Sequence, residues 1–305
     1  MKLPEAEWRA RPGLDRLLAA LDAEEGATRW VGGAVRDTLL GLPVTDIDCA
    51  TTIAPDAVIE RLRAAGIKVV PTGIAHGTVT AVIEGKPVEV TTLRRDVSTD
   101  GRRATVAFTD DWREDAARRD FTINALSADP LSGALHDYFG GLDDLAARRI
   151  RFIGDPLRRI AEDHLRILRF FRFHARFGEG ALDGAGYAAC VARANDLMAL
   201  SRERIADELL KLLAFPDPRA TLRAMLDGAI LRPVLPEIGE EGFARLDRLI
   251  AREQALAIAP EAIRRLAALL PADAGTVADI AKRLRLSRAD ENRLRVAAAP
   301  ESDDI

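Results

Sequence analysis

The sequence predicts an α+β fold, in which a head with a mixed β-sheet precedes an all-helical C-terminal part. Residues 28–110 alternate short β-rich runs with helical patterns. From about residue 155 onward, helical periodicity dominates and Gly or Pro marks each break. A chain of 305 residues has room for one large domain or for two to three small ones.

Composition and charge limit the class of protein. Hydrophobic residues make up 48% of the chain and charged residues 30%, as is typical of globular proteins. The formal net charge of −4 excludes a simple histone-like binder but leaves room for a local basic patch. Cys49 and Cys190 offer no zinc-binding spacing and no disulfide framework, which favours a cytoplasmic setting. The sequence shows no secretory signal and no membrane-spanning run, and predicts no protein partner.

Several elements of the head can be placed from the sequence. The β-rich runs are TRWVGG, DIDCATT, IKVVPT, GTVTAVIEG and KPVEVTTL, and the last two predict a hairpin that turns at Glu84 to Lys86. Helices are expected over 34–40, stopped by Gly41, and over 55–65, stopped by Gly66.

The sequence of the C-terminal part predicts helices only. Their expected ranges are 160–177, 184–198, 202–214, 218–227, 242–256, 261–269, 274–284 and 287–297.

The segment WVGGAVRDTLLG predicts a strand, a tight glycine turn and a helix. Gly32 and Gly33 allow the backbone to approach a ligand closely, and the helix N-terminus offers N–H groups to an anion. Arg36, in the first helical turn, is a candidate to bind phosphate oxygens. A simple turn is the alternative, since Gly-Gly before a helix is a weak signal.

Three carboxylates are candidates for a metal site. In a strand, Asp46 and Asp48 project to one face while Ile47 is buried on the other. Paired carboxylates repel each other unless a cation lies between them, and hard oxygen ligands suit Mg²⁺. Solvated acids at the end of a strand are the alternative, since D-x-D alone is common. Glu89, flanked by valines in a predicted strand, is the candidate third acid, the alternative being an outward-facing strand residue.

A compact Arg118-Arg119-Asp120 run precedes the apolar FTINAL. It could bring an arginine to a phosphate and the aspartate to a ribose hydroxyl. An N-capping Asp120 with solvated arginines explains the pattern equally well.

The segment 148–176 holds nine arginines and only three acids, which is the pattern of a polyanion site. Asp163 and Arg166 are expected one helical turn apart, as are Arg166 and Arg169. Such an acceptor and donor can hydrogen-bond the edge of a base. Arg172 drifts around the helix relative to Asp163, so geometry alone leaves its role open.

These segments resemble the class II tRNA nucleotidyltransferases (CCA-adding enzymes) and the related bacterial poly(A) polymerases. The similarity covers about residues 28–213. The matching segments, in family order, are VGGAVRDTLLG with TDIDCATT, GTVTAVIEG through RRDFTINAL, DYFGGLDDL, GDPLRRIAEDHLRILRFFRF and RERIADELLKLL.

The resemblance implies a polymerase-β-like head over 1–150, a helical neck for nucleotide selection over 151–215, and a helical body with a shortened tail for tRNA binding over 216–305. It implies Mg²⁺ on Asp46 and Asp48, with Glu89 as the third carboxylate. The nucleotide-binding residues it implies are Gly32, Gly33, Arg36, Arg119, Asp120, Asp163, Arg166, Arg169 and Arg172. The stretch from Arg95 to Trp112 would be a flexible loop that helps the switch from C to A.

The implied reaction is attack of the tRNA 3′-hydroxyl on the α-phosphate of CTP or ATP, with pyrophosphate leaving. Alternatives with the same head are a poly(A) polymerase or an enzyme that adds only CC or only A. An RNA-binding protein with an inactive head is disfavoured by the intact aspartate pair. A phosphohydrolase built on His136-Asp137 would need more than the four histidines present, so His76, His136 and His174 are interpreted as structural.

Overall fold

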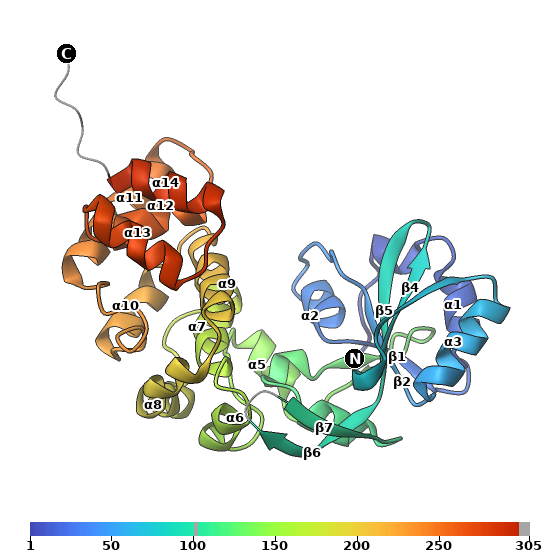
Figure 1. Ribbon diagram of the computed structural model, residues 1–305. Coiled ribbons are helices and arrows are strands. Elements are labelled where there is room, and N and C mark those ends of the chain that lie inside the picture. The colour runs from blue at the N-terminus through green and yellow to red at the C-terminus, as the bar shows by residue number, and fades with distance from the viewer. Residues whose placement is uncertain (101–102, 299–305) are drawn as a thin grey trace. The chain divides into compact units, whose positions relative to one another are not determined.

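Seven strands form one mixed sheet in the N-terminal half of the computed structural model (Figure 1). The structure describes residues 1–100 and 103–298, without the side chains of 96–106. The chain divides into two units, Met1–Gly154 and Asp155–Ile305. The first unit contains the sheet and the second contains only helices among the described residues, which confirms the predicted fold class.

The sheet has the strand order β3-β4-β5-β2-β1-β8-β9. Only the pair of β2 and β5 is parallel; the other neighbours are antiparallel. The strands are β1 (Thr28–Val31), β2 (Asp48–Thr51), β3 (Lys68–Gly73), β4 (Thr78–Ile83), β5 (Lys86–Thr92), β8 (Ser127–Ala128) and β9 (Leu135–His136). The parallel pair matters for the site, because it sets Asp48 directly beside Glu89.

The predicted hairpin is confirmed. Ile83 pairs with Lys86, so only Glu84 and Gly85 form the loop between β4 and β5. Both have positive φ, 47° and 74°, as a two-residue turn that follows the twist of the strands requires.

The N-terminal unit also contains helices. They are α1 (Leu14–Ala20), α2 (Gly33–Leu39), α3 (Pro55–Ala64), α4 (Trp112–Ala117) and α5 (Gly141–Ala146). The predicted ends of α2 and α3 are confirmed, since Gly41 and Gly66 follow them with φ of 66° and 70°. In Figure 1, α1 and α3 lie on one side of the sheet, where Leu17 and Leu62 are fully buried.

The stretch expected to be a flexible loop contains a two-stranded sheet of β6 (Arg94–Asp100) and β7 (Arg103–Phe108). Residues 101 and 102 of this stretch lie outside the described residues. Its base is joined to the large sheet, because Thr109 N donates to Leu93 O at 3.0 Å and Leu93 N donates to Thr51 O of β2 at 2.8 Å.

The second unit consists of helices, and two predicted helices are each divided. The helix expected over 160–177 is α6 (Pro156–Glu162) followed by α7 (Arg166–Phe177). The helix expected over 184–198 is α8 (Gly184–Ala192) followed by a 3₁₀ helix, Ala194–Ala199. The other predicted helices are present, as α9 (Arg202–Leu213), α10 (Arg219–Asp227), α11 (Glu240–Ala255), α12 (Ala262–Leu269), α13 (Ala274–Arg283) and α14 (Arg288–Ala298).

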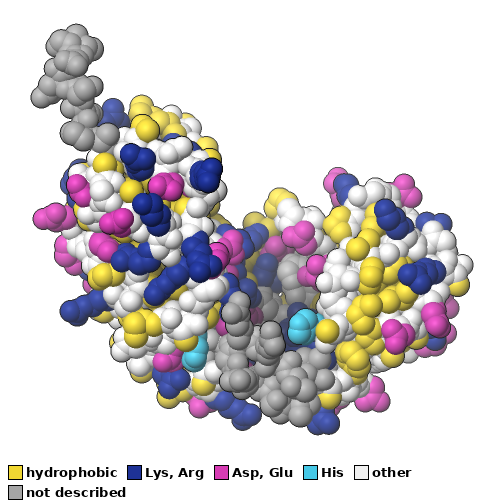
Figure 2. Space-filling model, viewed as in Figure 1, with side chains coloured by type: hydrophobic (Ala, Val, Ile, Leu, Met, Phe, Trp, Pro, Cys, Tyr) yellow, Lys and Arg dark blue, Asp and Glu magenta, His cyan; other side chains and the backbone are white. Residues whose placement is uncertain are grey.

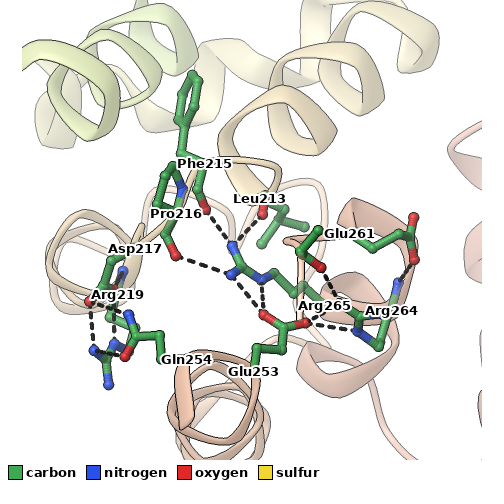
Figure 3. Close-up of polar contacts among 11 residues, drawn as sticks. Leu213, Phe215, Pro216, Asp217, Arg219, Glu253, Gln254, Glu261, Arg264 and Arg265 are labelled. Atoms are coloured by element: carbon green, nitrogen blue, oxygen red, sulfur yellow. Dashed lines mark hydrogen bonds and ion pairs between the residues drawn. The ribbon is translucent and has the colours of Figure 1, made fainter. Parts of the chain in front are cut away.

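A buried arginine joins three of these helices (Figure 3). Arg265 of α12, with 1% of its side chain exposed, donates to Glu253 of α11 at 2.8 Å. It also donates to the carbonyl oxygens of Leu213, Phe215 and Pro216, at and after the end of α9. A cation there stabilises the negative end of the helix, so α9, α11 and α12 share one polar centre.

None of the helices among the described residues combines the length and apolar character that crossing a membrane needs.

Candidate active site

The three predicted carboxylates line one hollow of the N-terminal unit. Asp46, Asp48 and Glu89, together with Ile47 and Pro87, surround a space of about 280 Å³. Asp48 opens β2 and is paired in register with Glu89 of β5, and Glu89 N donates to Ile47 O at 3.0 Å. The pairing of these two strands therefore brings together acids that lie 41 positions apart in the sequence.

Asp46 lies before the strand rather than in it. The prediction placed both aspartates in one strand, but β2 begins at Asp48. Asp46 is exposed, and Thr45 Oγ1 donates to it at 3.1 Å. Ile47 is buried, as predicted. Asp46 therefore reaches the hollow from a loop.

The carboxylates affect one another electrostatically. Burial, the charge of Glu89 and, to a smaller extent, that of Asp46 raise the pKa of Asp48 to about 6, although Arg119 acts in the opposite direction. Among the side chains that the structure describes, no group of three or more His, Cys, Asp or Glu is placed so as to hold a metal ion. Carboxylate oxygens are nevertheless the type of ligand that Mg²⁺ prefers in proteins.

The glycine turn lies against Arg119. Gly32 has φ of 63° and ψ of −124°, a conformation that side chains rarely adopt. A Cβ there would lie 2.9 Å from Nη1 of Arg119, and a Cβ on Gly33 would lie 3.6 Å from Nη2 of Arg36. The turn is therefore shaped so that two of the predicted nucleotide-binding arginines approach the backbone.

Asn124 connects these residues, and the sequence analysis missed it. Its Oδ1 accepts a bond from Arg36 at 2.6 Å, and its Nδ2 donates to Asp120 at 2.9 Å. Its backbone oxygen accepts a bond from Arg119 at 3.2 Å. Arg36, also paired with Asp37, is 6% exposed. A polar residue inside the apolar FTINAL run was the only sequence signal for this role.

Asp120 is buried and bonded within its own loop. Besides Asn124, its Oδ1 accepts a bond from Phe121 N at 2.8 Å. Arg118 is paired with Asp115 at 2.8 Å, and Arg119 with Asp115 at 3.5 Å. Arg119 also lies within electrostatic range of Asp48, so this loop contributes a cation beside the carboxylate hollow.

A second polar group lies in the helical unit, where Asp163 and Arg166 are not one helical turn apart. Asp163 is extended, with φ of −151°, and follows the end of α6. Its Oδ1 accepts a bond from Leu165 N at 3.1 Å, and Arg204 of α9 donates to it at 3.1 Å. An aspartate that bonds the backbone two residues on favours a turn over a continuing helix, which explains the break.

The arginines of α7 are paired with acids that the sequence analysis did not connect with them. Arg166 donates to Glu162 at 2.6 Å and to the carbonyl oxygen of Arg159 at 2.7 Å. Arg172 is paired with Glu208 of α9, which is 4% exposed and lies 4.0 Å from Arg169. Glu162 is one of the three acids already counted over 148–176, so Glu208 is the acid that these pairs add to that count. Figure 2 likewise shows basic and acidic side chains side by side over the helical unit.

Comparisons with known proteins show what the chain is similar to. Residues 28–151 match the family model described as "Poly A polymerase head domain", and 183–241 match "Probable RNA and SrmB- binding site of polymerase A". The mouse mitochondrial CCA tRNA nucleotidyltransferase 1 is 38% identical over 96% of this chain and 67% of its own length. The CCA-adding enzyme of Leuconostoc citreum is 36% identical, over 83% of this chain and 60% of that one.

Among solved structures, the CCA-adding enzyme of Bacillus stearothermophilus in complex with CTP is 30% identical, with a TM-score of 0.65. The match covers 95% of this chain and 67% of that one. The chain spans about half to two thirds of the length of the curated relatives it matches.

Proposed function

Because the chain belongs to the family of tRNA nucleotidyltransferases and poly(A) polymerases, we propose that it adds CMP and AMP to the 3′ end of tRNA. CTP and ATP would be the substrates, and pyrophosphate the second product. The observation that carries the proposal is the placement of Asp48 beside Glu89, with Asp46 at the same hollow. The relatives named CCA-adding enzymes support the choice of substrates.

Asp46 and Asp48 would hold Mg²⁺, with Glu89 as the third carboxylate. Their fit to a divalent cation is supported by the raised pKa of Asp48, which is caused first by burial and then by the charges of Glu89 and Asp46, and a cation would offset both causes. Bound there, the ion would supply charge stabilisation for the reacting phosphate and activation of the attacking hydroxyl.

The chain's own residues would hold the nucleotide. Gly32 and Gly33 allow the triphosphate to approach the backbone, and Arg119 supplies positive charge next to Asp48. Arg36 and Asp120, both bonded to Asn124, would shape the sites for phosphate and ribose. The tRNA 3′-hydroxyl oxygen would then bond to the α-phosphorus as the bond to pyrophosphate breaks.

Asp163 and Arg166 would select between C and A by hydrogen bonds to the base edge, and Arg169 and Arg172 would contact the nucleotide. The helix is broken between Asp163 and Arg166, so the support for this role comes from the partners of these side chains. Arg204 orients the carboxylate of Asp163, Glu162 orients the guanidinium of Arg166, and Glu208 orients Arg172. Selection would rest on side chains fixed by these partners rather than on their spacing along one helix.

The test is nucleotide incorporation on tRNAs that end before the first C or after CC, and on an unrelated RNA. We expect extension that stops after CCA. Unlimited adenylation of any RNA would favour the poly(A) alternative, and addition of CC alone or A alone would favour the specialised alternatives. No incorporation by the wild-type chain with Mg²⁺ present would contradict the proposal.

Replacing Arg166 with alanine is expected to lower discrimination between CTP and ATP about tenfold or more, since one bidentate contact to a base contributes about 1–3 kcal/mol. The ratio of kcat/KM for the two nucleotides measures this. Arg158→Gln is the matched control, because Arg158 also lies near Glu162 but is 82% exposed. Unchanged discrimination in Arg166→Ala would refute the selection role.

The reaction is proposed to take place in the cytoplasm. Cys49 and Cys190 are both buried free thiols, which suits a reducing compartment, although the mouse relative is mitochondrial.

A further inference from the structure

Arg29 lies on the same face of the sheet as the candidate catalytic carboxylates. It is paired in register with Ala50 across the antiparallel strands β1 and β2, and Ala50 follows Asp48 by two positions. Partners across a ladder, and alternate residues along a strand, share a face. Two residues along a strand span about 7 Å, so Arg29 lies about one row of side chains from Asp48.

Uncharged groups hold Arg29 in place. Its guanidinium carbon lies 4.1 Å from the centroid of the Trp112 ring, and Nη1 donates to the hydroxyl of Tyr138 at 3.1 Å. Trp112 in turn packs on Val31, Ala50 and Leu93, over the face that carries Asp48. Among the side chains that the structure describes, no carboxylate forms an ion pair with Arg29, whereas Arg36 and Arg118 of this unit each have one.

The neighbouring Arg113 repeats the arrangement. It is exposed, and its guanidinium carbon lies 5.5 Å from the centroid of Phe139. It too lacks a carboxylate partner among the described side chains. Tyr138 and Phe139 both pack on a cluster that includes Ala116 of α4. We call Arg29, Trp112, Arg113, Tyr138 and Phe139 the aromatic–arginine platform.

Acids close to the platform in sequence are bonded elsewhere. Asp111 accepts a bond from the backbone N of Arg113 at 2.7 Å. Asp137 accepts bonds from three backbone N–H groups, and Asp115 is paired with Arg118 and Arg119. These contacts leave the guanidinium groups of Arg29 and Arg113 without a counter-charge from these carboxylates.

We propose that the aromatic–arginine platform binds the single-stranded 3′ end of the RNA substrate, with a backbone phosphate on Arg29. An arginine stacked on a ring keeps its N–H edge available for phosphate oxygens. Single-strand binders combine such cations with aromatic side chains. The proposal rests on the proposed function, because an RNA whose 3′-hydroxyl lies at Asp48 would bring a neighbouring phosphate within reach of Arg29.

The test is the salt dependence of RNA binding to the full chain, measured by fluorescence anisotropy with a labelled tRNA that lacks CCA. Arg29→Gln is expected to raise Kd about tenfold and to reduce the slope of log K against log salt by about 0.7, the value for one single-strand phosphate contact. In turnover, KM for tRNA should rise while KM for CTP stays within about twofold. Arg61→Gln, at an exposed arginine of α3 paired with Asp22, should change neither value.

Arg29→Lys should retain the slope, because it keeps the charge, while it loses part of the affinity. An unchanged slope in Arg29→Gln would overturn the proposal even if affinity falls, since a purely structural role changes affinity without changing the number of phosphate contacts. If Arg29→Gln does not fold, the exposed Arg113→Gln decides by the same slope. RNA binding is measured without turnover. If the wild type binds RNA but incorporates no nucleotide, the proposed function is contradicted, while the slope can still be compared between wild type and variants. Absence of RNA binding by the wild type would overturn the platform.

Discussion

Replacing Asp48 with asparagine is expected to reduce CMP incorporation about 10³-fold or more, while binding of tRNA stays within about threefold of wild type. The loss follows from removal of a charged ligand at the proposed metal site, which would supply several kcal/mol of transition-state stabilisation. Single-turnover incorporation measures the first effect and anisotropy the second. Near-normal incorporation by the variant would contradict the catalytic assignment of Asp48.

The same variant is expected to make the metal-free protein more stable above pH 6. The folded-state pKa of Asp48 is about 6, above its ordinary value of 3.8. Stability linked to this raised pKa is present at about pH 4 and is lost as the pH rises through 6. Asparagine avoids this loss. The loss amounts to about 2 kcal/mol once screening of the partly exposed carboxylate by solvent is included.

Melting temperatures with and without Mg²⁺ measure this effect. At pH 8 without metal, Asp48→Asn should melt about 4–8 °C above wild type, and the difference should vanish near pH 4. Mg²⁺ should stabilise the wild type more than the variant. Glu89→Gln serves as the companion, since it removes one source of the repulsion and should also raise the melting temperature. A variant less stable than wild type at pH 8 would contradict a raised pKa of Asp48 in the folded protein.

Local patterns explain why much of the fold was predictable. The hairpin of β4 and β5 follows from Gly85 and the alternating residues around it, and the ends of α2 and α3 follow from Gly41 and Gly66. The sequence predicts Glu89 as a third acid of the site but does not predict that it pairs with Asp48. The parallel pairing that brings them together depends on a crossover that no short window of sequence contains.

Two of the polar contacts of the site residues could not be predicted, because the partners lie far along the chain. Arg36 is bonded to Asn124, 88 positions away, and Asp163 to Arg204, 41 positions away. The break before α7 was missed for a related reason. Asp163 is compatible with helical periodicity, yet its carboxylate forms a turn with Leu165 N and a bond with another helix. Glu208, which pairs with Arg172, lies outside the window 148–176, so the charge count over that window did not include it.

Replacing Arg265 with methionine is expected to destabilise the helical unit by about 3–5 kcal/mol, because it removes one partner of a buried ion pair and the donor to three carbonyl oxygens. The change would leave the carbonyl oxygens of Leu213, Phe215 and Pro216 without this donor, and would leave Glu253 with Arg264 as its partner (Figure 3). Urea unfolding followed by circular dichroism measures the loss.

Two further variants serve as controls for Arg265→Met. Arg265→Lys keeps the charge but not the fork of donors, so its cost should fall between those of wild type and Arg265→Met. Arg285→Gln removes a pair with Glu203 in which the arginine is 68% exposed, and should cost no more than about 1 kcal/mol. At temperatures where Arg265→Met remains folded, incorporation should persist, because Arg265 touches none of the proposed site residues. The stability of α9 matters for the proposed site, because this helix carries the partners of Asp163 and Arg172. A loss of unfolding free energy in Arg265→Met as small as that in Arg285→Gln would show that the end of α9 does not depend on the buried arginine.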